Sequence, residues 1–237
     1  MELAEYALMD TAEDHMWWYR ALHRRLVHGL AGVDGSVLDA GCGTGGLLAY
    51  LRAERPDLRR VGVEWAEPAA VRAAAKSGAP IVRGSVNALP FADACFGAAV
   101  AADLLCHRAV EPPRALAELR RVLRPGGRLV INMPAYGWLM SAHDRLVHNV
   151  RRCTARELTA MLGDAGFVRV RASYWNSLLL PLMVAQRKLL ARDAAASDVA
   201  PFPPWLDATL HAMTEIERRL PFRLPAGGSV LATAERP

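Results

Sequence analysis

Glycines at 41, 43 and 46 follow a short apolar run and precede a helical pattern. A glycine loop between a strand and a helix lets the backbone approach a ligand closely, and this spacing is typical of dinucleotide-binding turns. Glu64, near the end of the next apolar run, suits a carboxylate that accepts hydrogen bonds from ribose hydroxyls. These residues predict a cofactor that contains a ribose.

Asp39, just before the loop, distinguishes two classes of cofactor. A carboxylate there would repel the pyrophosphate of a nicotinamide dinucleotide, which binds at this turn in dehydrogenases. It would attract the positive sulfur and the ammonium group of a sulfonium cofactor. The alternative interpretation of Asp39 is a cap of the turn or helix. The sequence therefore favours a sulfonium cofactor, and a nicotinamide-dependent dehydrogenase is the distant alternative.

Histidines that could transfer a proton follow two later apolar runs. His107 lies at the edge where ligands bind in open α/β sheets, and it is interpreted as a base or as a helix cap. His143, Asp144 and His148 form a second cluster. They fit a base with its orienting carboxylate, a substrate contact, a divalent metal site or a solvated loop. No further ligand is evident, so no metal is predicted.

Tyr174, Trp175 and Asn176 end another apolar run. An aromatic pair followed by an amide suits the wall of a substrate pocket, and edge packing is the alternative. Trp18, in an aromatic cluster near the N-terminus, is assigned to the same pocket.

Apolar runs alternate with helical patterns, which predicts an α/β fold with a mainly parallel sheet and helices on both faces. The predicted strands are Ser36–Ala40, Val61–Glu64, Ile81–Arg83, Phe96–Ala102, Arg128–Met133, Val168–Tyr174 and Ser229–Ala234. The predicted helices between them are Leu47–Glu54, Pro68–Ser77, Pro112–Leu123 and Thr154–Ala165. Thr154 and Glu157 have capping-box spacing, and residues 125–127 predict a tight turn.

The chain is predicted to form a single domain over residues 1–237. Residues 1–30 are expected to be a helical cover, 31–175 the cofactor-binding core, 176–228 a helical lid insertion and 229–237 the last strand. The insertion has predicted helices at Leu178–Leu190 and Trp205–Leu220. The apolar first helix favours either an apolar substrate or contact with a membrane surface.

Composition narrows the class of protein. The 237 residues are 52% hydrophobic, and the net charge of +5 comes from arginines that are spread along the chain beside 24 acids, so no nucleic-acid partner is expected. Four cysteines without paired spacing favour a reduced, cytoplasmic setting. No segment is a signal peptide or is long enough to cross a bilayer, although peripheral contact stays open. A monomer and a homodimer are both compatible with the sequence.

Five blocks occur in one order over about residues 36–175: VLDAGCGTG, VGVEW, NALPFADACFGAAVAADLLCH, LRRVLRPGGRLVINMP and LTAMLGDAGF. Together they resemble the class I S-adenosylmethionine-dependent methyltransferases, in particular the type 11 branch that acts on small molecules. The resemblance implies a Rossmann-like sheet of seven strands with the last strand antiparallel. It also implies S-adenosylmethionine as the cofactor and S-adenosylhomocysteine as the product.

The resemblance implies roles by position. Asp39 would support the loop, and the residues under the methionine and ribose would be Gly41, Cys42, Gly43, Gly45 and Ala101. Glu64 would bind the ribose, Trp65 would stack on the adenine, and Ser85 and Val86 would lie at the edge of the adenine ring. Tyr19, with Arg20 or Arg24, would bind the cofactor carboxylate. Ser85 and Gly97 stand where the family usually has Asp.

The resulting expectation is methyl transfer to an oxygen, nitrogen or carbon of a small, largely apolar metabolite, for example in secondary metabolism. A lipid- or quinone-directed methyltransferase at a membrane surface is the first alternative. A non-catalytic methyltransferase-like binding subunit is a more distant one.

Overall fold

The computed structural model describes residues 3–187 and 202–237. One seven-stranded sheet has the order β3-β2-β1-β4-β5-β7-β6, with β7 antiparallel to both of its neighbours and the other adjacent pairs parallel, which confirms the predicted fold class. The strands are β1 (Ser36–Ala40), β2 (Arg59–Glu64), β3 (Ile81–Arg83), β4 (Phe96–Ala102), β5 (Leu123–Pro134), β6 (Val168–Trp175) and β7 (Ser229–Glu235).

Strand β5 starts earlier than predicted. Leu123 already pairs with Phe96, and the register shifts before the Ala98–Arg128 pair. The turn expected at residues 125–127 is therefore an irregularity within the strand, where Gly126 adopts a left-handed φ of +73°.

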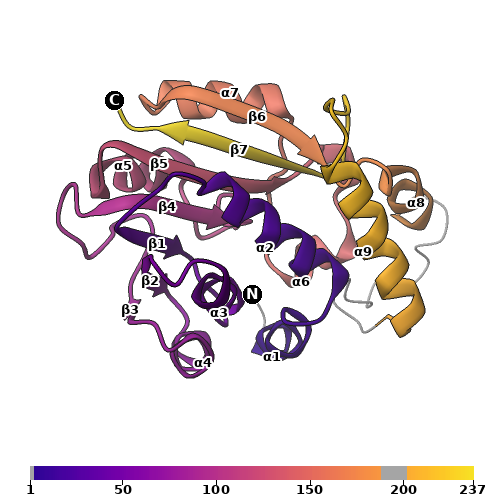
Figure 1. Ribbon diagram of the computed structural model, residues 1–237, viewed down its shortest axis with the longest axis horizontal. Coiled ribbons are helices and arrows are strands. Elements are labelled where there is room, and N and C mark those ends of the chain that lie inside the picture. Colours follow the sequence, from indigo (N-terminus) through magenta and orange to yellow (C-terminus); the bar gives the residue numbers. More distant parts are fainter. Residues whose placement is uncertain (1–2, 188–201) are drawn as a thin grey trace.

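Alternate residues of the central strands enter two separate cores, as the two-residue period of a strand requires. Leu38 and Ala99 face a core that includes side chains of α5 (Pro112–Val122) and α7 (Ala155–Asp164). Val37 and Val100 face a second core that includes side chains of α2 (Trp17–Gly29) and α3 (Gly46–Glu54). Helices therefore cover both faces of the sheet, and α4 (Glu67–Ser77) packs against α3, β2 and β3 (Figure 1).

The predicted capping box is confirmed at the start of α7. Thr154 Oγ1 accepts from the Glu157 backbone amide at 3.2 Å, and the Glu157 carboxylate accepts from the Thr154 amide at 2.7 Å. These bonds satisfy amides that the first helical turn cannot.

The remaining helices gather at the end of the sheet to which the parallel strands point (Figure 1). They are α1 (Leu3–Ala12), the 3₁₀ turn η1 (Gly137–Leu139), α6 (Ala142–Leu146), α8 (Leu180–Ala185) and α9 (Pro204–Arg218). Helix α9 matches the second predicted insertion helix, and α8 is shorter than the first, whose last residues lie outside the described part of the chain. Within the described ranges no helix is long and apolar enough to cross a membrane.

Helix α9 is attached to α2 by paired charges. Arg20 lies 2.6 Å from Asp207, and Arg24 lies 2.7 Å from Glu215. The guanidinium of Arg25 donates to the Thr214 carbonyl at 2.7 Å. These contacts join the N-terminal cover to the insertion and hold both over the same edge of the sheet.

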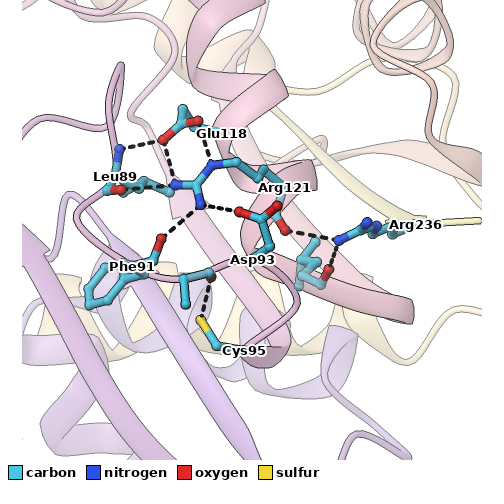
Figure 2. Close-up of polar contacts among 9 residues, drawn as sticks. Leu89, Phe91, Asp93, Cys95, Glu118, Arg121 and Arg236 are labelled. Atoms are coloured by element: carbon cyan, nitrogen blue, oxygen red, sulfur yellow. Dashed lines mark hydrogen bonds and ion pairs between the residues drawn. The ribbon is translucent and has the colours of Figure 1, made fainter.

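Arg121 on α5 holds the segment that leads into β4 (Figure 2). Its guanidinium donates to the carbonyls of Leu89 and Phe91 at 2.9 and 2.8 Å. It also contacts Asp93 at 2.6 Å and Glu118 at 2.8 Å, and these hydrogen bonds raise its pKa. One side chain thus anchors the end of the loop that begins near Ser85.

Candidate functional site

The glycine loop joins β1 to α3. Gly41, Gly43 and Gly45 have left-handed φ values of +75°, +54° and +92°, which glycine adopts without strain. A side chain at Gly45 would lie 2.7 Å from the Ala73 Cα, and the backbone there cannot move aside easily. The loop therefore presents bare backbone to the space above it.

Glu64, at the end of β2, closes the loop from beside it. Its carboxylate accepts from the amides of Gly43 at 3.0 Å and Ala66 at 2.8 Å, and it lies 3.5 Å from the Tyr6 hydroxyl. Burial raises the pKa of Glu64, and these hydrogen bonds partly offset the rise. Glu64 lines the cavity described below, so its carboxylate lies where a ribose contact was predicted.

Asp39 is 3% exposed at the end of β1. Burial, together with the nearby charges of Glu13 and Glu64, raises its pKa to about 8. Glu13 is also buried and accepts from Thr44 at 2.7 Å and Lys76 at 2.6 Å. An excess of buried carboxylates is costly unless a positive charge joins them, so this end of the site favours a cation.

Asp103 adds a further carboxylate that the sequence analysis missed. It directly follows β4 and accepts from Asn132 Nδ2 at 2.9 Å. Burial raises the pKa of Asp103 to about 6. Its place after a buried strand, at the edge where ligands bind, was the available sign.

Helix α1 covers the loop, and the sequence analysis also missed the side chains of this helix that line the site. Tyr6 and Met9 line the same space, and the Met9 methyl lies 2.7 Å from where a side chain on Gly43 would start. The spacing of Tyr6, Met9 and Glu13 places them on one helical face, which is the pattern that could have revealed them.

One cavity of about 1180 Å³ runs from the glycine loop to the insertion. It exceeds the roughly 300–1,000 Å³ usual for a single small ligand. Of the predicted site residues, its wall includes Trp18, Tyr19, Asp39, Gly41, Cys42, Gly43, Glu64, Trp65, Ser85, Val86, His107, His143, Asp144 and Asn176.

Seven residues with a predicted role lie outside that wall, and two of them are Gly45 in the glycine loop and Arg20, which pairs with Asp207. Ala101 is fully buried in the core beneath α5, and the cavity begins one residue later, at Ala102. Arg24 pairs with Glu215, so it joins α9 to α2 in place of the predicted contact with a cofactor. Tyr174 stacks on Tyr136, and Trp175 donates to Asn132 at 2.8 Å, as edge packing requires.

His148 also lies outside the wall and is next to His107, with ring centroids 5.9 Å apart. Burial, together with nearby positive charges that include those of His148, Arg108 and Arg151, lowers the pKa of His107 to about 4. The imidazole of His107 is therefore neutral at pH 7 and faces the cavity, where it can accept a proton.

Asp144 forms a buried ion pair with Arg152. The carboxylate accepts from the guanidinium at 2.7 and 2.9 Å and from the Ser141 amide at 2.7 Å. Burial alone would raise the pKa of Asp144, but Arg152 and Ser141 lower it below its usual range. Across residues 3–187 and 202–237, no group of three metal-ligating side chains occurs.

The predicted adenine end lies at the rim. Trp65 is 72% exposed, whereas Val86 is buried. Ser85 Oγ accepts from the Asn87 amide at 3.2 Å, so this hydroxyl also shapes its own loop. A side chain at Gly97 would collide with the Asp34 carbonyl oxygen, which explains why the usual Asp is absent there.

The residues present fit a sulfonium cofactor. The bare glycine backbone offers a surface for a methionine chain. The buried carboxylates, whose pKa values are raised, offer negative charge for a cation, and the exposed indole at the rim offers a stacking face for a base.

Comparisons with known proteins indicate the family of the chain. Residues 38–131 match the model of a methyltransferase domain. The chain is 32% identical to the ubiquinone/menaquinone biosynthesis C-methyltransferase of Paracoccus denitrificans, over 63% of this chain and 72% of that protein. It is 37% identical to a malonyl-[acyl-carrier protein] O-methyltransferase of Herminiimonas arsenicoxydans, over 68% of this chain and 65% of that protein.

A methyltransferase structure from Thermotoga maritima superposes with a TM-score of 0.66 at 19% identity, covering 99% of this chain and 96% of the other. The chain spans less than two thirds of the lengths of the first curated relatives that it matches, from 36% to 65%. With its fold, glycine loop and acidic cavity, the chain belongs to the class I S-adenosylmethionine-dependent methyltransferases.

Proposed function

We propose that this protein transfers a methyl group from S-adenosylmethionine to a small, largely apolar acceptor that binds beneath α8 and α9. The observation that carries the proposal is the single cavity that joins the acidic glycine loop to an apolar compartment. Leu179, Leu182, Phe202, Leu206 and Leu210 line that compartment. A shared cavity lets donor and acceptor meet away from bulk water, which methyl transfer requires.

S-adenosylmethionine supplies an electrophilic methyl group when bound. The protein's own residues hold that cation through Asp39 and its neighbouring carboxylates, and they position the acceptor in line. His107 is the proposed proton acceptor, because its imidazole is neutral and faces the cavity. We assign the described insertion helices α8 and α9 to a lid over the acceptor, and the N-terminal helices α1 and α2 to a cover of the cofactor.

The test has two stages. Calorimetry should detect binding of S-adenosylhomocysteine and none of NAD, and methyl transfer is then assayed by mass spectrometry with phenolic, quinol and carboxylic acceptors. Glu64→Gln should weaken S-adenosylhomocysteine binding by about tenfold or more, because a neutral amide accepts ribose hydroxyls less strongly. Glu67→Gln, an exposed carboxylate on the same segment, is the matched control. Binding of NAD alone would overturn the proposal.

A quinone-like acceptor is the second candidate. Relatives from Paracoccus denitrificans and Thermus thermophilus are named as ubiquinone/menaquinone and demethylmenaquinone methyltransferases. Leu182, Trp205 and Phe222 of the insertion are 55%, 70% and 60% exposed, which favours contact with a membrane where such molecules reside. Binding to anionic lipid vesicles that disappears in Trp205→Ser would support it, and equal binding of both proteins would count against it.

A further inference from the structure

The side-chain amide of Asn176 has no hydrogen-bond partner in the part of the chain that the structure describes. Within the described residues, both Nδ2 and Oδ1 are buried and unsatisfied, and the residue is 0% exposed. Buried amides are almost always hydrogen-bonded, because removing them from water without a partner costs free energy. Asn176 lines the cavity at the point where β6 enters the insertion.

A second unsatisfied group lies in the same wall. Trp17 Nε1 is buried and has no acceptor among the described residues. Trp17 packs with Leu179 and Leu210 in an apolar cluster that borders the cavity. This part of the wall thus presents two buried donor atoms, Asn176 Nδ2 and Trp17 Nε1, and one buried acceptor atom, Asn176 Oδ1, that no described residue satisfies.

Met183 on α8 lies near the Asn176 amide. A methyl group placed on Gly228 would lie 2.5 Å from the Met183 methyl and 3.3 Å from Asn176 Nδ2, so the thioether and the amide lie side by side. Methionine is unbranched and changes rotamer easily. An entering ligand can displace it and reach the amide.

From these contacts we infer that Asn176 recognises a neutral hydroxyl group of the acceptor. An amide that needs both an acceptor and a donor is matched by a hydroxyl, which supplies both. An ether or a carboxylate offers acceptors only and leaves Oδ1 unsatisfied. Trp17 Nε1 is the second donor to the hydroxyl oxygen. The inference rests on the proposed function, since it names the substrate class of that site.

Backbone conformation gives a competing reason for asparagine here. Asn176 has a left-handed φ of +59°, which asparagine tolerates better than most residues. Glycine would serve that conformation equally well, so Asn176→Gly removes the amide without straining the chain. Arg169→Gly is the matched control, because Arg169 lies in β6, the strand that ends just before Asn176, has a φ of +51° and is exposed outside the cavity.

The experiment compares para-butylphenol with para-butylanisole, its methyl ether, by calorimetry with and without S-adenosylhomocysteine. The wild-type protein should bind the phenol at least about tenfold more tightly, since the ether leaves a buried group unpaired. The ratio should approach one in Asn176→Gly and stay unchanged in Arg169→Gly. Trp17→Phe should weaken both ligands, because each offers an oxygen acceptor.

Equal affinity of the wild-type protein for the two compounds, failure of both to bind, or a preference that survives in Asn176→Gly would overturn the inference. If Asn176→Gly fails to fold, the wild-type ratio and Trp17→Phe decide. S-adenosylhomocysteine binding without phenol preference removes only the role of Asn176. Phenol preference without S-adenosylhomocysteine binding removes only the methyl-transfer function.

Discussion

Replacing Asp39 with Asn should stabilise the unliganded protein and weaken binding of the cationic cofactor. In the folded state the pKa of Asp39 is about 8, whereas its ordinary value is 3.8. A carboxyl with a raised pKa contributes fully to stability below its unfolded pKa, and that contribution is lost as the pH rises through the folded pKa. The wild-type protein should therefore lose stability between about pH 4 and pH 8.

The magnitude follows from the same shift. A pKa difference of about 4 units corresponds to at most about 6 kcal/mol, at about 1.4 kcal/mol per unit. Because Glu13 and Glu64 contribute to the raised pKa of Asp39, the cost of burying their own charges remains in the variant. The free energy of unfolding of the Asp39→Asn variant should thus be roughly 2–5 kcal/mol higher than that of the wild-type protein at pH 8, and nearly equal to it at pH 4.

Urea denaturation at several pH values measures this difference. Asp34→Asn is the control, because Asp34 precedes β1 and is exposed beside Arg124. Calorimetry should show that Asp39→Asn loses at least about tenfold more affinity for S-adenosylmethionine than for S-adenosylhomocysteine, which lacks the sulfonium charge. Parallel pH profiles for the wild-type protein and Asp39→Asn, or equal losses for the two ligands, would refute the reasoning.

Three further predictions concern the rest of the site. Arg121→Ala should lower the free energy of unfolding by about 2–4 kcal/mol in denaturant titrations, because it leaves two carbonyls and Glu118 without their donor; a change below about 0.5 kcal/mol would contradict the network in Figure 2. Asp144→Asn should cost about 3–5 kcal/mol by leaving the Arg152 charge buried, and the double variant Asp144→Leu with Arg152→Met should recover part of it; additive losses would argue against a buried pair. His107→Ala should abolish methyl transfer while S-adenosylhomocysteine binding persists, and wild-type turnover should rise through about pH 4 and then level off; unchanged turnover in the variant would remove His107 from the mechanism.

The sheet was predictable because its strands are apolar runs, which periodicity and punctuation mark clearly. The glycine loop and Asp39 were predictable for a similar reason, since local spacing carries their meaning. Asp103 and Tyr6 were not recognised, because their importance depends on which elements converge at one sheet edge. Arg24 shows the reverse case, because it was expected to bind the cofactor carboxylate but forms an ion pair with Glu215, 191 residues away in the sequence. Such long-range pairings leave no local pattern in a sequence.

The insertion leaves and re-enters the sheet at neighbouring positions. Trp175 pairs with Ser229, and the Gly228 amide donates to the Asn176 carbonyl at 3.2 Å. A loop whose two ends are already held together pays little more closure entropy as it lengthens. Residues 177–227 can thus diverge in length and composition during evolution while β6, β7 and the glycine loop keep their register. The two paired ends of the insertion therefore also mark where it could be grafted. Exchanging the insertion between relatives should exchange the preference for the acceptor and leave the cofactor-binding core unchanged.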